Sequence, residues 1–143
     1  MALKYFGTDG IRGEYGGPSL NDGIAFRAGA AMARLLKQQH EIEDPLMVVG
    51  RDTRASGLKL IAALGAGFRS EGGAIESIGV APTPGIAKVV ELGNAVAGCA
   101  VTGSHNPSKD NGIKFFQSNG TKPSESFELV LDRSVGGVAT PKE

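Results

Sequence analysis

Apolar residues recur along this chain at two spacings, and their alternation predicts the arrangement of secondary structure. Apolar positions three or four residues apart extend from Ile24 to about residue 39 and predict a long helix. We expect this helix to start at Pro18–Ser19, with Ser19 as its N-terminal cap. Short apolar runs typical of buried strands cover residues 45–50, 74–78 and 95–101.

Further helices and several extended segments complete the pattern. The helices are expected at residues 56–70, 84–92 and 125–133. Glycine-rich residues 5–17 favour short extended pieces around a turn, and residues 113–116 favour a strand that returns from a loop. Asn111-Gly112, directly before this strand, is a strong turn signal.

Helices therefore alternate with strands that are apolar almost throughout, which is typical of a sheet buried on both faces. The predicted fold class is α/β: a three-layer α/β/α domain with a largely parallel mixed sheet. We expect the domain to cover residues 1–134, and residues 135–143 to form a linker or frayed tail. The 143 residues and the hydrophobic content of 41% suit one domain with a substantial core and argue against disorder.

Charge and cysteine content exclude several classes of protein. The 15 basic and 15 acidic side chains give a formal net charge of zero, so neither nucleic acid nor an anionic membrane is favoured as a partner. The single cysteine, Cys99, excludes an internal disulfide and a multi-cysteine zinc site, and its apolar surroundings predict an inert core residue. No apolar run reaches the ~18 residues of a membrane span, and Lys4–Tyr5 lead into a polar stretch rather than a secretory signal. A cytoplasmic location is expected.

The 22 glycines direct attention to loops, because glycine permits positive φ angles and close approach of the backbone to a ligand. Three polar loops, residues 51–57, 79–84 and 102–112, each follow a buried strand. The carboxyl ends of parallel strands share one edge of a sheet, where ligands bind. We therefore expect one neighbourhood to contain Arg51, Asp52, Arg54, Thr83, Ser104 and His105.

Neither a nucleotide-binding motif nor a self-contained metal site is predicted. The chain has no P-loop motif, and the stretch that begins at Gly65 and Gly67 has Ser70 in place of the third glycine of a dinucleotide fingerprint. This stretch also falls inside a predicted helix. The histidines, His40 and His105, are far apart in the sequence and have no carboxylate cluster beside them, and His40 is expected on the surface.

A serine and a histidine stand side by side in the loop after residue 101. Adjacent residues on an extended loop point in different directions, so His105 is expected to be poorly placed to take the proton of Ser104, and no G-x-S-x-G elbow occurs. Phosphoryl chemistry fits better, because a phosphoserine needs cationic neighbours and hydrogen-bond donors. Lys114 and Arg12 can supply the charge, and Asn106, His105 and loop N–H groups the hydrogen bonds. Composition alone leaves open an ordinary turn between two strands.

Five short motifs occur in order along the chain. They are KYFGTDGIRG from Lys4, GRDTR from Gly50, PTP from Pro82, TGSHNPSKDNGIKFF from Thr102 and NGTK from Asn119. Together they closely resemble the first domain of the α-D-phosphohexomutases, and within this family they are most like the bacterial phosphoglucosamine mutases. The resemblance extends from about Lys4 to Lys122.

The resemblance implies roles for the serine loop and its neighbours. Ser104 is the implied carrier of the phosphoryl group, and its phosphate is the implied contact to a metal ion. Lys114 is implied as an acid/base or charge-stabilising group, with Arg12 and His105 beside the same reacting centre. The implied catalytic residues are Ser104, Lys114, Arg12 and His105, and the implied substrate-binding residues are Thr8, Arg12, Ser104, His105, Asn106 and Lys114.

The reaction implied by the resemblance interconverts glucosamine 6-phosphate and glucosamine 1-phosphate through a phosphoserine and a bisphosphate. Mg²⁺ is the implied cofactor, bound by the phosphoserine and by aspartates of a DGDxDR-like loop, with glucosamine 1,6-bisphosphate as activator. The implied partners are a phosphosugar substrate and the remaining domains of a four-domain parent enzyme. No DGD motif occurs in the 143 residues, so the metal-, sugar- and phosphate-binding domains are expected to be absent and the chain inactive alone.

One residue departs from the family pattern, and two other functions stay open. Gly103 stands where the family usually has alanine, and a looser serine loop is expected there. The alternatives are a phosphomannomutase or phosphoglucomutase domain, and a non-catalytic module that binds sugar phosphates or a partner protein. Sugar specificity, the phosphorylation state of Ser104 and the oligomeric state are left undecided.

Overall fold

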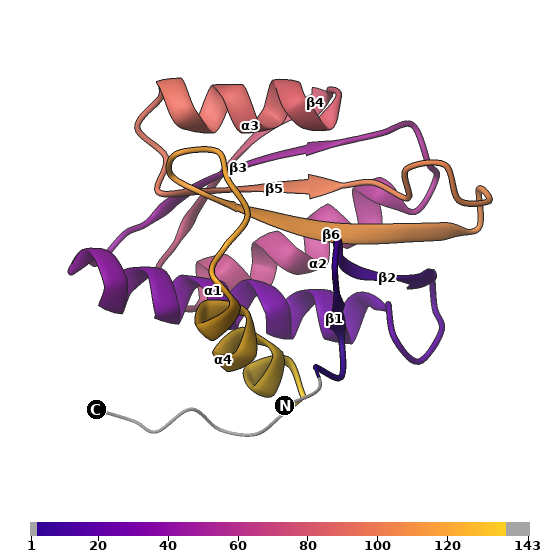
Figure 1. The fold of residues 1–143 in the computed structure, drawn as a ribbon, viewed down its shortest axis with the longest axis horizontal. Coiled ribbons are helices and arrows are strands. Elements are labelled where there is room, and N and C mark those ends of the chain that lie inside the picture. Colours follow the sequence, from indigo (N-terminus) through magenta and orange to yellow (C-terminus); the bar gives the residue numbers. More distant parts are fainter. Residues whose placement is uncertain (1–2, 137–143) are drawn as a thin grey trace.

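The computed structural model describes residues 3–136, which form one six-stranded sheet between two layers of helices (Figure 1). Across the sheet the strands are β1 (Phe6–Gly7), β2 (Gly10–Glu14), β6 (Asp110–Gln117), β5 (Ala97–Val101), β3 (Leu46–Arg51) and β4 (Ala74–Val80). The helices are α1 (Asp22–His40), α2 (Gly57–Ser70), α3 (Thr83–Leu92) and α4 (Glu125–Val135). The predicted three-layer α/β fold with a mixed sheet is confirmed.

The sheet has a parallel part and an antiparallel part. β3 pairs in parallel with both β4 and β5, as expected for strands that are joined through helices. β6 is antiparallel to β5 and to β2, and β2 is antiparallel to β1. Parallel pairing is therefore less extensive than predicted, because the loop between β5 and β6 is too short for the crossover that a parallel strand needs.

The helices cover the two faces of the sheet unequally. α1, α2 and α4 lie on one face, and α3 lies on the other (Figure 1). The larger core, on the side of α1 and α2, includes the fully buried side chains of Leu64 and Phe68. On the α3 face, Ile86 packs with Ala100 and Phe116 in a smaller core. No helix within residues 3–136 has the length and apolar character needed to cross a membrane.

Cys99 lies on β5 inside the larger core, as predicted for a core residue. Burial disfavours the thiolate and raises the pKa of the Cys99 thiol well above its ordinary value. A thiol that stays protonated is a poor nucleophile and a poor metal ligand. Cys99 therefore belongs to the packing of the sheet and not to its chemistry.

The N-terminus of α1 lies later in the sequence than predicted. The helix begins at Asp22, and the side chain of Asn21 accepts a hydrogen bond from the N–H of Ile24 at 2.9 Å. Asn21 therefore caps the helix, and the predicted start at Pro18–Ser19 is wrong. Asparagine and serine are comparable N-terminal caps, so residue type alone did not distinguish the two positions.

β6 is longer than predicted and includes the Asn111-Gly112 pair, which therefore is not a turn. Asn111 pairs with Gly13, and Gly112 pairs with Arg12, in the antiparallel ladder to β2. The side-chain amide of Asn111 donates to Ser56 Oγ at 2.8 Å, and its side-chain oxygen accepts the N–H of Gly112 at 2.9 Å. These tertiary contacts override the local turn preference of an Asn-Gly pair.

The last helix holds the N-terminal segment in place. α4 continues to Val135, so the predicted tail begins too early, and residues 137–143 of that tail lie outside the described residues. From α4, the buried carboxylate of Asp132 accepts the backbone N–H groups of Lys4–Phe6 at 2.7–3.0 Å. The segment that leads into β1 is therefore fixed by a residue from the other end of the described chain.

Candidate active site

The serine loop, residues 102–109, leaves the carboxyl end of β5 beside the loop that follows β3. The N–H of Asp52 donates to the carbonyl of Val101 at 3.2 Å, which places the β3–α2 loop against the end of β5. The parallel strand β4 ends at the same edge, as predicted. Thr83, however, begins α3 and makes no hydrogen bond to the serine loop within the described residues.

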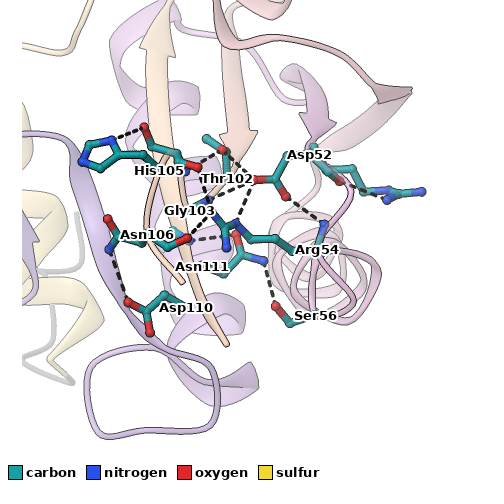
Figure 2. Close-up of polar contacts among 12 residues, drawn as sticks. Asp52, Arg54, Ser56, Thr102, Gly103, His105, Asn106, Asp110 and Asn111 are labelled. Atoms are coloured by element: carbon teal, nitrogen blue, oxygen red, sulfur yellow. Dashed lines mark hydrogen bonds and ion pairs between the residues drawn. The ribbon is translucent and has the colours of Figure 1, made fainter. Parts of the chain in front are cut away.

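Asp52 organises the start of the serine loop (Figure 2). Its Oδ2 accepts the hydroxyl of Thr102 at 2.8 Å and the N–H of Gly103 at 3.1 Å. The same oxygen forms an ion pair with Nε of Arg54 at 2.9 Å. Partial burial opposes ionisation of Asp52, but the hydrogen bonds that it accepts outweigh burial and hold the pKa of this carboxyl below its ordinary value. Asp52 is therefore an ionised acceptor at neutral pH.

Arg54 binds the rest of the serine loop through its backbone. The guanidinium donates to the carbonyl oxygens of Pro107 (2.7 Å), Ser104 (2.8 Å) and Asn106 (2.9 Å), as Figure 2 shows for the polar contacts of this region. Its side chain is only 10% exposed. The positive charge of Arg54 is thus taken up by Asp52 and by backbone oxygens, and not presented to solvent.

Gly103 lies directly against this guanidinium. A Cβ atom at position 103 would overlap the Cζ and Nε atoms of Arg54 and lie 2.8 Å from Nη2. The absence of a side chain therefore permits close packing here. Arg54 fills the space that a side chain would take, and the looser loop expected from Gly103 stays a prediction.

Ser104 has a left-handed backbone conformation, with a φ of 55°, and is exposed. This conformation costs a residue with a side chain about 1–2 kcal/mol. Hydrogen bonds on both sides of Ser104 stabilise it: its N–H donates to Thr102 Oγ1 at 3.0 Å, and its carbonyl accepts from Arg54. The hydroxyl oxygen is presented at the surface, where a phosphoryl group can reach it.

The left-handed turn at Ser104 also brings the His105 ring close to the Ser104 hydroxyl. Ser104 Oγ lies 3.3 Å from Nδ1 of His105. The expectation that His105 is poorly placed for the hydroxyl proton is therefore wrong, because the loop is not extended at Ser104. Within residues 3–136 no carboxylate binds the His105 ring, so the pair lacks the third member of a hydrolase triad.

The two predicted cations lie on the two strands that follow β5 across the sheet, Lys114 on β6 and Arg12 on β2. Thr102 N–H donates to Gly112 O at 3.0 Å, and Gly112 pairs with Arg12 on β2. Neighbouring strands are ~4.8 Å apart, so the Arg12 backbone lies about 10 Å from the start of the serine loop. Lys114 follows Gly112 at the period of two that keeps strand residues on one face. Gly112 lies between Arg12 and Thr102 and has no side chain, so no side chain of β6 separates these two residues.

Arg12 and Lys114 differ in their partners. The Nε of Arg12 is buried without a hydrogen-bond partner among the described residues. Arg12 lines an open cavity of about 370 Å³ that Thr8 and Asp9 also line. Lys114 forms an ion pair with Asp9 at 3.9 Å and lies 5.8 Å from the centre of the Phe116 ring. An anion entering this cavity would meet Arg12 among the side chains that line it.

The remaining predicted site residues occupy the loop and the β1–β2 turn. The N–H of Asn106 donates to Gly103 O at 3.0 Å, and its side-chain amide donates to Asp110 at 3.3 Å. Asn106 therefore helps to close the serine loop. Thr8 is exposed in the turn between β1 and β2, next to Asp9.

Sequence reasoning missed part of the support for this site. Asp52 and Arg54 were expected at this edge, but not as ligands of the serine loop backbone. Asn111 was assigned to a turn, yet it is fully buried and joins β6 to Ser56 before α2. The available signal was the position of Asn111 just before the apolar residues 113–116. An asparagine that is buried with such a strand needs hydrogen-bond partners from other elements, and Ser56 is such a partner.

The described residues do not form a metal site by themselves. Within residues 3–136, no group of three or more His, Cys, Asp or Glu side chains is placed to hold a metal ion. Asp52, the carboxylate bound to the serine loop, already accepts hydrogen bonds from Thr102, Gly103 and Arg54. A hard divalent cation at Ser104 would need oxygen ligands from outside these residues.

Comparisons of the sequence with known proteins agree on one family. Residues 3–137 match the family described as "Phosphoglucomutase/phosphomannomutase, alpha/beta/alpha domain I". The chain is 44% identical over 142 residues to a phosphoglucosamine mutase of Bordetella avium, and 41% identical over 137 residues to one of Neisseria meningitidis serogroup B. These alignments cover 94% and 96% of this chain, but 32% and 31% of the relatives. The chain thus spans about a third of the length of these relatives.

The structure gives a concordant result. A phosphoglucomutase/phosphomannomutase family protein from Burkholderia thailandensis superposes with a TM-score of 0.78 at 27% identity, covering 93% of this chain and 30% of that one. Fold and site together define an α/β domain with an exposed serine at the carboxyl end of a strand and cationic side chains on the neighbouring strands. The chain belongs to the phosphohexomutase family, as its α/β/α domain I.

Proposed function

We propose that this chain is the phosphoserine-bearing N-terminal domain of a phosphosugar mutase, with Ser104 as the residue that carries the phosphoryl group. The observation that carries the proposal is the exposed, left-handed Ser104, with His105 at its hydroxyl and the strands of Arg12 and Lys114 beside its loop. We further propose glucosamine phosphates as substrates. Curated relatives at 40–44% identity are phosphoglucosamine mutases, which favours this sugar over glucose or mannose.

In the proposed reaction, O1 of glucosamine 6-phosphate attacks the phosphorus of phosphorylated Ser104. The bond from Oγ to phosphorus breaks as the new O–P bond forms, which gives glucosamine 1,6-bisphosphate and the free Ser104 hydroxyl. The bisphosphate then reorients, Oγ attacks the phosphoryl group on O6, and glucosamine 1-phosphate leaves. Each attacking hydroxyl loses its proton to a base and each leaving oxygen gains one, so the phosphoserine is restored.

The side chains around Ser104 match the needs of this transfer. His105 Nδ1 lies 3.3 Å from Oγ, which supports its proposed role as the base that accepts the serine proton when the hydroxyl attacks. Arg12 and Lys114 would stabilise the negative charge on the transferring phosphoryl group. Asn106 keeps the loop closed through Gly103 and Asp110.

The proposal keeps Mg²⁺ as the cofactor, held by the phosphoserine oxygens and by carboxylates outside the described residues. Bound there, the ion would neutralise charge on the transferring group. Those carboxylates, the sugar-recognition groups and a second phosphate site are proposed to lie in further domains of the natural protein. Glucosamine 1,6-bisphosphate would reload Ser104 after accidental loss of its phosphate.

The test uses the natural full-length protein that contains this chain. Mass spectrometry of protein purified from cells should locate a phosphate on Ser104, and Ser104→Ala should abolish turnover of glucosamine 6-phosphate. Ser108→Ala, in the same loop, is the matched control and should leave turnover unchanged. Normal activity of the Ser104→Ala protein would end the proposal. Parallel assays with glucose and mannose phosphates separate a phosphoglucosamine mutase from a phosphoglucomutase or phosphomannomutase.

The isolated 143-residue chain provides a second comparison. We expect it to lack turnover and to bind glucosamine 6-phosphate weakly, because it would hold the sugar phosphate through part of a site only. Submicromolar affinity of the isolated chain would instead favour the non-catalytic binding module.

A further inference from the structure

We propose that Thr102 is a positioning residue for the proposed phosphoryl carrier: its hydroxyl, oriented by the carboxylate of Asp52, holds Ser104 in the left-handed conformation. The inference rests on the proposed function of Ser104 for its effect on turnover. The hydrogen bond between Thr102 and Ser104 can be followed without turnover, by exchange of the Ser104 amide.

Thr102 joins the sheet to the turn that contains Ser104. Its N–H donates to the carbonyl of Gly112 at 3.0 Å, so its backbone is held to β6. Two residues later, the N–H of Ser104 donates to Thr102 Oγ1 at 3.0 Å. A hydroxyl that accepts the N–H two residues further along forms a side-chain turn, which takes the place of a backbone turn. The β-branched side chain of Thr102 has few rotamers, so its oxygen is held where this turn needs it.

Asp52 fixes the direction of the hydrogen bonds of this hydroxyl. A threonine hydroxyl has one proton to donate, whereas an ionised carboxylate can only accept. Asp52 Oδ2 lies 2.8 Å from Thr102 Oγ1, so the Thr102 proton points to Asp52 and the lone pairs of Oγ1 are left for the N–H of Ser104. Hydrogen bonds in such a chain polarise one another, which makes Oγ1 a stronger acceptor.

The hydrogen bond has two consequences for Ser104. With a φ of 55°, Ser104 lies in a region that residues with a side chain rarely occupy, and one net hydrogen bond is of the size needed to offset that cost. The bond also engages the only backbone donor of Ser104, so this N–H is not available to a phosphoryl group. Thr102 thus acts on the reaction through the backbone of Ser104, and not by touching the phosphoryl group.

Thr102→Val tests this role because valine keeps the shape of the side chain and lacks the hydroxyl. Phosphoryl transfer needs the attacking oxygen, phosphorus and leaving oxygen roughly in line, and a displacement of ~1 Å can lower a rate about 100-fold. We expect Thr102→Val to lower kcat of the full-length protein about 10- to 100-fold, with KM changed less than about threefold. Thr102→Ser keeps the hydroxyl and should retain kcat within about threefold of the unmodified protein.

Thr53→Val is the matched control. Thr53 is exposed in the β3–α2 loop, and its hydroxyl makes no hydrogen bond within residues 3–136, so kcat should not change. A Thr102→Val protein with kcat within about twofold of the unmodified protein would overturn the proposal, as would a Thr102→Ser protein that loses as much as Thr102→Val. Should Thr102→Val fail to fold, Thr102→Ala takes its place in the comparison with Thr102→Ser. If neither folds while Thr102→Ser does, the hydroxyl serves folding and not the position of Ser104, and the proposal is overturned.

A double variant tests the part of Asp52. If Asp52 acts on Ser104 through the Thr102 hydroxyl, Thr102→Val should lower kcat less in the Asp52→Asn background than in the unmodified protein. Losses that multiply in the double variant would show that Thr102 acts independently of Asp52, which contradicts the proposal.

Hydrogen exchange of the full-length protein gives a readout that does not depend on activity. Overlapping peptides that do and do not include the Ser104 amide isolate this group. It should exchange faster in Thr102→Val than in Thr102→Ser or the unmodified protein, while peptides of α1 stay protected. Unchanged exchange of the Ser104 amide would sink the proposal. If Ser104→Ala retained turnover, the proposed function would fail, but this exchange result would still decide whether Thr102 holds the turn.

Discussion

Nζ of Lys114 lies 3.9 Å from Oδ1 of Asp9, and this contact joins two motifs from distant parts of the sequence. Asp9 belongs to the turn between β1 and β2, and Lys114 to the middle of β6. Both side chains are partly exposed, at 56% for Asp9 and 30% for Lys114, so the pair is weak in water. Asp9 therefore holds the Lys114 ammonium near the cavity that Asp9 and Arg12 line. Because this ion pair is weak, the ammonium can leave it for an anion with more negative charge, such as a phosphoryl group.

Removal of the Lys114 charge should therefore impair transfer more than folding. We expect Lys114→Gln to lower kcat of the full-length protein about 10²–10³-fold, because the negative charge of the transferring group loses a cation. Lys88→Gln, which removes an exposed lysine from α3, is the matched control and should keep normal turnover. Steady-state kinetics measures both variants, and thermal unfolding checks that they fold. Turnover of Lys114→Gln within a factor of about two of the unmodified protein would exclude a role in the reaction.

The hydrogen bonds of Asp52 make stability depend on pH. The pKa of Asp52 is lower in the folded chain than in the unfolded chain, so its contribution is fully present above the unfolded pKa and is lost as pH falls through the folded pKa. Asp52→Asn should lower the free energy of unfolding by about 2 kcal/mol at pH 7, because a charged acceptor of several hydrogen bonds is replaced. The difference between the two proteins should shrink below about pH 4.

Urea unfolding of the unmodified and Asp52→Asn 143-residue chains between pH 3 and pH 7 measures the difference in their free energies of unfolding, which we expect to be ~2 kcal/mol at pH 7. Asp44→Asn, at an exposed position before β3, is the control and should follow the unmodified chain at every pH. A difference that stays constant down to pH 3, or grows there, would show that the ionised carboxylate of Asp52 is not what stabilises the loop.

The fold was largely predictable because periodicity is a local property. The helical spacing from Ile24 and the apolar runs of the strands are visible in short windows, and each corresponds to an element of the structure. The antiparallel pairing of β6 with β2 was not predictable in this way. It joins residues far apart in the sequence, such as Gly13 and Asn111, and no short window contains both.

Sequence reasoning located the loop that contains Ser104 and His105, but it did not predict the geometry of that loop. The motif at residues 102–116 placed Ser104 and His105 in one loop beside Lys114. The left-handed turn that brings His105 to the Ser104 hydroxyl was missed, because local sequence favours glycine there and not serine. Arg54, in the β3–α2 loop, stabilises that conformation by a hydrogen bond to the Ser104 carbonyl, and this contact joins distant parts of the sequence.

Asp132 provides a test of how the ends of the domain are joined. Its carboxylate accepts the N–H groups of Lys4–Phe6, and it is 6% exposed. In Asp132→Asn an NH₂ group faces backbone donors in place of an oxygen, so buried N–H groups lose their acceptor. We expect the free energy of unfolding of the 143-residue chain to fall by about 2 kcal/mol, measured by urea denaturation. Glu125→Gln, at an exposed position in the first turn of α4, should change it by less than ~0.5 kcal/mol.

Because this segment leads into the β1–β2 turn with Asp9, hydrogen exchange should also rise in residues 4–7 of the Asp132→Asn chain and not in α2. Equal stability of the two substituted chains would show that the N-terminal segment is held by its apolar contacts, such as the packing of Phe6 near Phe115, and not by the carboxylate.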